Sequence, residues 1–335
     1  MKTVIRMTAL MLALLMLAVI CCGCSDQKEQ EQRVIGTCAG YEIRYEELRY
    51  LTLTYKSFFE DTYGEGIWDD PATAEQYRAE LEETVFRLLL NNYAVLAAGD
   101  YYLPQKNAIA SDGIQDAVDE MIDSMVESYG GKKGYRQELK KMNATDNLLR
   151  FTCGVSQVEN ELMHALVQDW NLIEDDPDDF YDWMKDGNYV YVQHVFVCNN
   201  EGEKPEDNRA IAEQARLDLL NKVKTIEQLV GSSVNEDTQN VSPYYVVRGV
   251  YKPNIEDAVF DLAFPGDVSY VTETETGFYV FVRMESDDST LLAQVNKLLN
   301  DYQIAMTESY VEEFKKDLKI EWNEYGASLD LLTIQ

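Results

Sequence analysis

An acidic break at residues 174–179, Glu-Asp-Asp-Pro-Asp-Asp, separates two parts of the chain whose residue patterns differ. Before the break, apolar residues recur every three or four positions, most clearly from Leu81 to Leu96, and this spacing predicts helices that bury one face. After the break, the segment from Tyr189 to Cys198 is rich in Tyr, Val and Phe, which favours a buried strand. The change predicts an α+β protein with a domain limit near the break.

Further segments on both sides of the break have patterns typical of short strands and helices. A strand, a Gly turn and a second strand are predicted within residues 34–43, and helices follow from about Tyr45. The elements predicted after the break are a helix at 208–224, strands at 244–248 and 277–284, a short helix at 255–262 between those strands, a long amphipathic helix at 292–318 and a closing strand at 319–322.

The first residues have the pattern of the cleaved export signal of a bacterial lipoprotein. Lys2 and Arg6 precede an apolar run from Met7 to Ile20, which is shorter than the roughly 20 residues that span a membrane. Gly23-Cys24 matches the end of a lipobox, where the cysteine becomes the lipidated N-terminus. We therefore predict lipidation of Cys24 and an extracytoplasmic protein held on the bacterial membrane, with a plain secretory signal as the alternative.

Composition excludes several classes of function. With a net charge of −31, the chain would repel phosphate backbones, so nucleic-acid binding is not expected. The cysteines that would remain after cleavage show no Cys-x-x-Cys spacing; they are Cys24, Cys38, Cys153 and Cys198. The chain has two histidines, His164 and His194. These features indicate neither a zinc site nor a disulfide framework, and we expect no metal and no cofactor.

Three sequence blocks after the break occur in the order of a known family. The first is His194-Val195-Phe196-Val197, the second runs from Ile255 to Leu262, and the third is Gly277-Phe278-Tyr279-Val280-Phe281. They resemble the His-Ile-Leu-Val strand, the aromatic-Glu-x-Ala helix and the Gly-x-His-Ile-Ile strand of parvulin-type peptidyl-prolyl isomerases. Residues 34–50 look like the opening of a chaperone domain. The whole therefore resembles the PrsA-like and SurA-like extracytoplasmic foldases.

The resemblance implies a divided arrangement of domains. After a signal peptide at 1–23 and a polar tether at 24–33, a helical SurA-like chaperone domain would occupy residues 34–185. A parvulin-like α+β domain would be inserted at 187–287. Residues 288–335 would then supply a helix and a strand that complete the chaperone domain.

The resemblance also implies a catalytic site in the inserted domain. Position by position, His194 matches the first of the two histidines of a parvulin, Thr276 matches its hydroxyl residue and Asp237 matches its Cys or Asp. Tyr279 stands at the position of the second histidine, where a tyrosine can still donate a hydrogen bond. These four residues are the predicted catalytic residues.

The expected activity is isomerisation of X-Pro peptide bonds in unfolded secreted proteins, the predicted partners. An isomerase needs an apolar pocket for the proline ring, here predicted to include Ile255 and Phe260, and polar groups that favour the twisted amide. Because one histidine of the pair is replaced, a weak isomerase and a non-catalytic holdase remain alternatives. A solute-binding lipoprotein is a third alternative, and it would require repeated βαβ patterning that the helical first half lacks.

Overall fold

The computed structural model describes residues 30–199 and 204–335, and contacts divide the chain into two compact units. By its described residues, the first unit contains 30–61, 65–159 and 311–335, and the second contains 62–64, 160–199 and 204–310. The predicted signal peptide and Cys24 lie outside the described residues. Within the described ranges, the helices are too short or too polar to cross a membrane.

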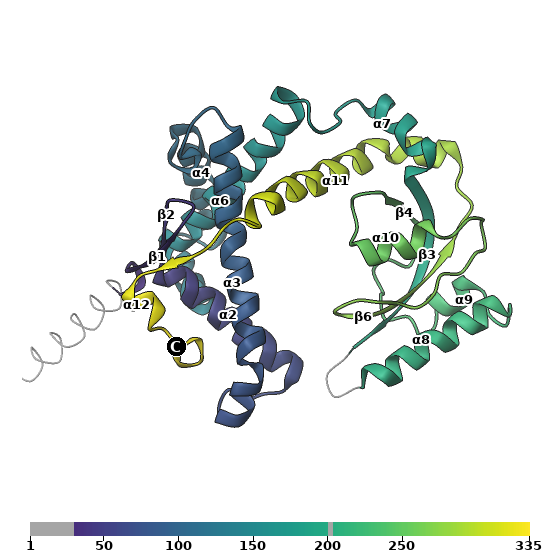
Figure 1. The fold of residues 1–335 in the computed structure, drawn as a ribbon, viewed down its shortest axis with the longest axis horizontal. Coiled ribbons are helices and arrows are strands. Elements are labelled where there is room, and N and C mark those ends of the chain that lie inside the picture. The colour runs from purple at the N-terminus through teal and green to yellow at the C-terminus, as the bar shows by residue number, and fades with distance from the viewer. Residues whose placement is uncertain (1–29, 200–203) are drawn as a thin grey trace, which may run out of the picture. The chain divides into compact units, whose positions relative to one another are not determined.

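The first unit opens with the β-hairpin that the Gly turn predicts. β1 (Val34–Cys38) and β2 (Tyr41–Arg44) pair antiparallel, and they are joined by Ala39 and Gly40, whose φ angles are 53° and 84°. Two residues with positive φ are what a tight hairpin turn requires. The predicted closing strand is present as β7 (Glu321–Trp322), which pairs antiparallel with β1. Segments from the two ends of the described chain therefore share one sheet (Figure 1).

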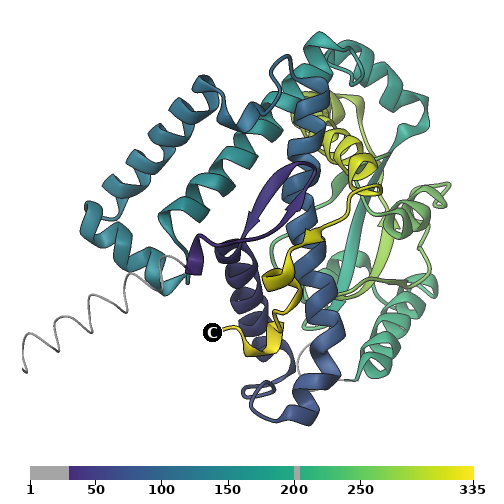
Figure 2. The ribbon, with the colours of Figure 1, turned by 60° about the vertical axis from the view of Figure 1, so that its left-hand side comes forward.

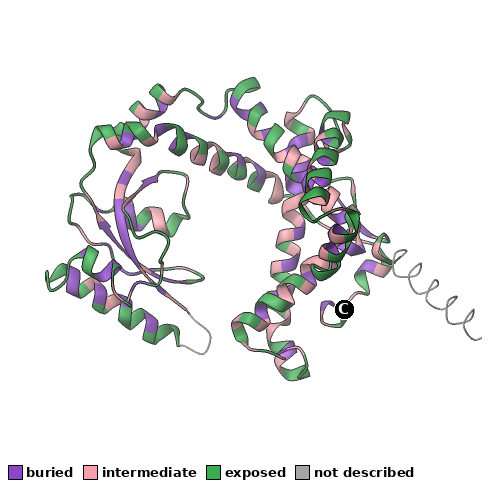
Figure 3. Ribbon diagram, turned by 180° about the vertical axis from the view of Figure 1, so that it is seen from behind, coloured by how far each residue is buried: buried purple, intermediate pink, exposed green. Residues whose placement is uncertain are grey.

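Helices make up the rest of the first unit. α3 (Pro71–Tyr102) begins after Asp70, whose side chain accepts a hydrogen bond from the backbone of Ala72. Its predicted apolar stripe is buried (Figure 3), and it packs beside β7, where the rings of Phe86 and Trp322 lie 5.6 Å apart (Figure 2). The other helices are α2 (Tyr45–Tyr63), α4 (Asp112–Ser128), α5 (Lys132–Lys141), α6 (Asp146–His164), α12 (Glu324–Ala327) and the 3-10 turns η1 (Ala108–Ala110) and η4 (Leu331–Thr333), of which α2 and α6 end in the second unit.

The second unit is built around a four-stranded sheet of order β4-β3-β6-β5. Its strands are β3 (Tyr189–Cys198), β4 (Tyr244–Val247), β5 (Thr272–Glu273) and β6 (Gly277–Arg283). The strands predicted at 189–198, 244–248 and 277–284 are thereby confirmed. Every strand pairing within the described ranges is antiparallel, whereas the solute-binding alternative requires parallel βαβ units.

The helices of the second unit cover both faces of this sheet. They are α7 (Pro177–Trp183), α8 (Pro205–Leu220), α9 (Ile226–Val230), α10 (Pro253–Phe260), most of α11 (Asp288–Lys315) and the π-helical turns η2 (Ala165–Asp169) and η3 (Met184–Asn188). Val195 and Val197 of β3 pack in a core with α8 and α9, while Val190 and Val192 pack with α10. Because successive strand residues point to opposite faces, His194 lies on the α10 face of the sheet.

The acidic break is the beginning of a helix. Asp176 accepts hydrogen bonds from the backbone N–H groups of Asp178 and Asp179, at 2.8 and 3.3 Å, and Pro177 takes the first position of α7. Acidic residues are favourable there because the first turn of a helix carries partial positive charge. The predicted limits of the chaperone-like and parvulin-like domains concern independent folding, and they stay a prediction.

Candidate active site

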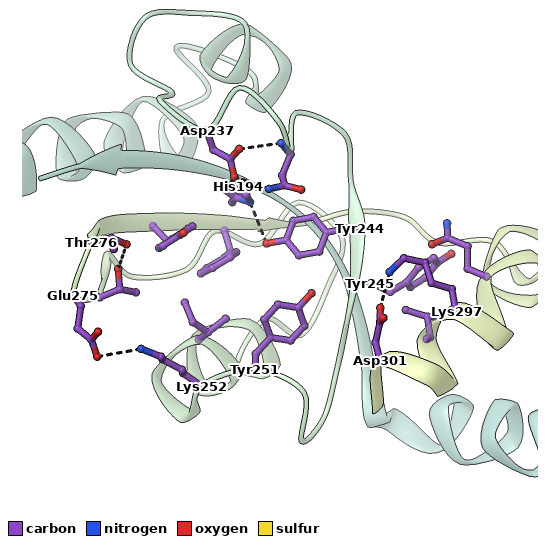
Figure 4. A pocket seen from close by; sticks show the side chains of 17 residues that line it. His194, Asp237, Tyr244, Tyr245, Tyr251, Lys252, Glu275, Thr276, Lys297 and Asp301 are labelled. Atoms are coloured by element: carbon purple, nitrogen blue, oxygen red, sulfur yellow. Dashed lines mark hydrogen bonds and ion pairs between the residues drawn. The ribbon is translucent and has the colours of Figure 1, made fainter. Parts of the chain in front are cut away.

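A cavity of about 450 Å³ lies beside β3, β4 and β6 in the second unit (Figure 4). Its walls also include the loop before β4, the start of α10 and the helical stretch of α11 from Gln294 to Asp301. Five of the residues singled out from the sequence line it, namely His194, Asp237, Ile255, Thr276 and Tyr279. The fold therefore brings together residues that lie up to eighty-odd positions apart along the chain, as the parvulin resemblance implies.

His194 is the buried polar centre of this cavity, with 3% of its surface exposed. Its Nδ1 atom lies 3.0 Å from the hydroxyl oxygen of Tyr244, and its Nε2 atom lies 3.2 Å from Oδ2 of Asp237 (Figure 4). A carboxylate only accepts hydrogen bonds, so Nε2 carries the proton of the neutral ring and donates a hydrogen bond to Asp237. Nδ1 is then the acceptor, and the hydroxyl of Tyr244 donates to it.

The surroundings of His194 favour the neutral ring. Burial lowers the pKa of His194 below its ordinary value, and this effect exceeds the opposing effects of the charge and the hydrogen bond of Asp237. Burial also raises the pKa of Tyr244, so the hydroxyl keeps its proton and remains a donor. At neutral pH the pair is therefore an uncharged imidazole and an uncharged phenol.

Asp237 is held by a loop that is fixed to β3. Asn235 accepts a hydrogen bond from the backbone N–H of Phe196 at 3.0 Å, which ties the loop to the strand. Oδ1 of Asp237 accepts from the backbone N–H groups of Gln239 and Asn240, at 3.0 and 2.9 Å. Burial acts to raise the pKa of Asp237, but the hydrogen bonds from these two residues and the interaction with His194 hold it below the ordinary value. Asp237 is therefore a carboxylate at neutral pH.

Tyr279 contacts His194 through its ring. It lies on β6 opposite Phe196, and its ring centroid is 5.2 Å from that of His194, with the ring planes at 63°. Phe196 and Phe281 flank it at centroid distances of 4.4 and 5.6 Å. The residue that the resemblance matches to the second parvulin histidine is thus part of an aromatic wall.

The remaining residues singled out from the sequence differ in their placement. Thr276 is exposed at the rim of the cavity, where its hydroxyl oxygen lies 3.4 Å from that of Thr274. Ile255 is half-buried in α10 and lines the cavity. Phe260 lies away from the lining; it packs in the core under α10, with the guanidinium of Arg248 3.8 Å from its ring centroid.

Several residues of the cavity were not predicted from the sequence. The most important is Tyr244, the hydrogen-bond partner of His194. Tyr251 also lines the cavity, and an ion pair between Lys252 and Glu275, at 3.1 Å, lies at its rim. The available signal was the pair of tyrosines that opens the predicted strand at 244–248, because alternation places one of them on each face of a sheet.

A second cavity, of about 920 Å³, lies in the first unit and contains two buried carboxyl groups. Glu46 and Glu47, at the start of α2, are each 4% exposed. Oε1 of Glu47 accepts a hydrogen bond from the backbone N–H of Arg44 at 2.8 Å, and Oε2 lies 2.7 Å from the hydroxyl of Tyr93. Because Glu47 has partners within the protein on both oxygens, it is better explained as part of the fold than as a ligand-binding group.

Within the described ranges, His, Cys, Asp and Glu side chains do not form a group of three or more that could hold a metal ion.

Comparison with known proteins points to one kind of protein. No family model matches the chain. The sequence is 25% identical over 216 residues to the foldase protein PrsA of Clostridium tetani (strain Massachusetts / E88), and the aligned part covers 60% of each protein. The chain resembles a PrsA foldase. This similarity confirms the resemblance that the sequence motifs indicated, and it spans about three fifths of the length of the PrsA protein.

Solved structures of similar proteins include two PrsA proteins and a SurA-like chaperone. PrsA of Bacillus anthracis is 14% identical, with a TM-score of 0.37 and coverage of 68% of this chain and 96% of that one. PrsA of Streptococcus pneumoniae is 14% identical, with a TM-score of 0.36 and coverage of 78% and 86%. A structure from a study of the SurA-like chaperones PEB4 and Cj1289 of Campylobacter jejuni is 16% identical, with a TM-score of 0.21 and coverage of 68% and 94%.

Proposed function

We propose that this protein is an extracytoplasmic foldase that binds unfolded secreted proteins and accelerates the cis-trans isomerisation of their X-Pro peptide bonds. The observation that carries the proposal is the cavity in which a buried, neutral His194 lies between Tyr244 and Asp237. The similarity to PrsA supports a foldase role. Isomerisation needs neither a metal nor a nucleophile, because rotation about the amide bond breaks no covalent bond.

To act as an isomerase, the cavity has to lower the barrier to rotation about the X-Pro peptide bond. Resonance opposes rotation of a peptide bond by about 18–20 kcal/mol, and the uncatalysed exchange at X-Pro takes tens to hundreds of seconds. A twisted amide has lost much of its resonance and its charge separation, so a pocket poor in water favours it over the planar form. Ile255, Phe281 and the ring of Tyr279 would contact the proline ring, and the polar groups around His194 would be fixed before the substrate arrives.

A non-catalytic holdase is the second candidate, and Tyr279 is the observation that favours it. Where a parvulin has its second histidine, this residue meets His194 by an edge-to-face ring contact. If the isomerase activity depends on an imidazole at that position, the cavity would only bind client segments. The two functions differ in one measurable respect, since a holdase delays aggregation without shortening a proline-limited folding phase.

Refolding of a client protein whose slow phase is limited by prolyl isomerisation tests the proposal. The wild-type chain should shorten that phase. In His194→Ala the acceleration should be roughly 100-fold smaller, because a preorganised polar group is removed. Suppression of client aggregation should be unchanged in this variant.

His164→Ala is the matched control, because His164 is the other histidine of the chain and lies exposed on α6. It should behave as the wild type in both assays. Equal acceleration by wild type, His194→Ala and His164→Ala would contradict a site at His194, and no acceleration by any of them would leave the holdase.

The location is also part of the proposal, with a lipid on Cys24 as the anchor. The apolar run from Met7 to Ile20 and the Gly23-Cys24 pair support it. In a bacterial host, Cys24→Ala should release the protein into the medium or leave an unprocessed precursor, as followed by cell fractionation and mass spectrometry. Cys22→Ala should remain in the membrane fraction with a lipidated N-terminus. A correctly cleaved Cys24→Ala protein that stays in the membrane would rule out this anchor.

A further inference from the structure

Tyr244 makes a hydrogen bond with His194 that neither the sequence motifs nor the parvulin resemblance assigns. It is the first residue of β4 and lies opposite Val192 of β3, two positions from His194 along that strand. Residues two apart on a strand share a face, so Tyr244 and His194 are diagonal neighbours on the α10 face. The hydroxyl oxygen is 3.0 Å from Nδ1, and the two rings cross at 82° with their centroids 5.6 Å apart.

Both nitrogen atoms of His194 are therefore engaged. Asp237 accepts from Nε2 and decides which nitrogen carries the proton, while Tyr244 donates to Nδ1 and satisfies the remaining buried acceptor. Hydrogen bonds to both nitrogen atoms fix the orientation of the imidazole ring as well as its position. With a single bond to Asp237, the imidazole would keep its tautomer but could rotate about its Cβ–Cγ bond.

We propose that Tyr244 is a positioning residue for His194, whose imidazole it holds through the hydrogen bond to Nδ1. Its position supports this role, since Tyr279, which the resemblance matches to the second parvulin histidine, meets the ring edge to face. A phenol suits the task because burial raises the pKa of Tyr244 and keeps its single proton in place. The proposal rests on the proposed isomerase function, and it assigns Tyr244 an effect that passes through the imidazole.

The hydrogen bond itself can be observed by nuclear magnetic resonance of the full chain with ¹⁵N-labelled histidine. The chain has two histidines, so His164→Ala assigns the signals of His194 without ambiguity. In the wild type we expect a protonated Nε2 and a bare Nδ1 whose signal is displaced by the hydrogen bond it accepts. In Tyr244→Phe, which removes only the hydroxyl, the Nδ1 signal should move toward that of a free acceptor while Nε2 stays protonated.

Kinetics on an X-Pro peptide supply the second readout. Loss of the hydrogen bond from Tyr244 should raise the activation free energy by about 1.4 kcal/mol. The kcat of Tyr244→Phe should therefore fall about tenfold, with KM little changed. Tyr191→Phe is the matched control, because Tyr191 lies on the opposite face of β3, outside the cavity lining, where its ring packs against Tyr245 at 4.5 Å. It should leave both the Nδ1 signal and kcat unchanged.

The outcomes separate this proposal from the proposed function. An unchanged Nδ1 signal in Tyr244→Phe, or a displaced signal with unchanged kcat, overturns the role assigned to Tyr244. A wild type without isomerase activity overturns the proposed function and the catalytic use of Tyr244 together. The Nδ1 signal would then still decide whether the hydroxyl holds the imidazole.

Discussion

Gly277→Ala is expected to destabilise the second unit by about 3 kcal/mol, since it combines a backbone clash with a strained conformation. Gly277 is the first residue of β6, has a φ of +153° and pairs with Cys198 of β3. A methyl group at this position would lie 2.2 Å from the carbonyl oxygen of Val197. The strands would have to separate where they align Thr276 and Tyr279 with His194, so isomerase activity should fall together with stability.

Hydrogen exchange of the β3 and β6 amides measures this loss, because the opening free energy of each amide reports on the sheet itself. Gly266→Ala is the matched control. Gly266 also has a positive φ, of 92°, but a methyl group there would have no atom within 4 Å. It should cost about 1 kcal/mol from the backbone conformation alone. Equal losses in the two variants would show that the close approach of Val197 has no energetic consequence.

Glu47→Gln is expected to stabilise the first unit by about 3 kcal/mol at pH 8 and to have little effect at pH 4. Burial raises the pKa of Glu47 from 4.5 to about 7. The hydrogen bonds from Tyr93 and from the backbone of Arg44 act in the opposite direction, but their effect is smaller. A raised carboxyl pKa means that the folded protein binds the proton more tightly than the unfolded chain does. The stability that Glu47 contributes is therefore fully present below pH 4.5 and is lost as the pH rises through about 7.

The geometry around Glu47 accommodates a protonated carboxyl group. The hydroxyl of Tyr93 lies 2.7 Å from Oε2 of Glu47 and 3.1 Å from the backbone oxygen of Glu42. When the carboxyl carries a proton, it can donate to the phenol oxygen while the phenol donates to the Glu42 carbonyl. A glutamine amide at position 47 can donate in the same way, which is why Glu47→Gln imitates the protonated state.

Thermal unfolding between pH 4 and pH 8, with hydrogen exchange of α2 and α3 to identify the transition, checks this prediction. The wild-type transition should fall as the pH rises, and that of Glu47→Gln should fall less. Glu46, whose pKa burial also raises, leaves part of the slope in place. Glu42→Gln removes an exposed carboxylate of the same cavity and should keep the full wild-type slope. Parallel curves for wild type and Glu47→Gln would contradict a buried, protonated Glu47.

Much of the fold was predictable because local patterns determined it. The stretch from Tyr189 to Cys198 carries enough β-branched and aromatic residues to predict β3 with its observed limits. The strand at 319–322 was also predicted, and its partner is β1, nearly three hundred residues earlier. Such pairings follow from tertiary structure rather than from local sequence. The sequence therefore predicted the strands but neither their partners nor the register of the pairing.

The candidate site was less predictable for the same reason. His194 and Tyr279 follow from blocks that resemble a known family, Asp237 was matched to that family in the loop between them, and the structure brings the three together. Tyr244 could not be recognised because its role depends on the pairing of Val192 with β4, which places a hydroxyl beside Nδ1. Phe260 belongs to a predicted helix, but the helix turns this ring toward Arg248 and the core under α10.

Exchange spectroscopy on a short X-Pro peptide tests the central claim, that the cavity around His194 is a prolyl isomerase site, because it observes isomerisation without a folding client. The peptide shows separate cis and trans signals, and its uncatalysed exchange takes tens of seconds or more. With a small amount of wild-type chain, exchange cross-peaks should appear, and they should be lost with His194→Ala and kept with His164→Ala. Peptide signals that shift on binding while no exchange appears with the wild type would contradict the claim.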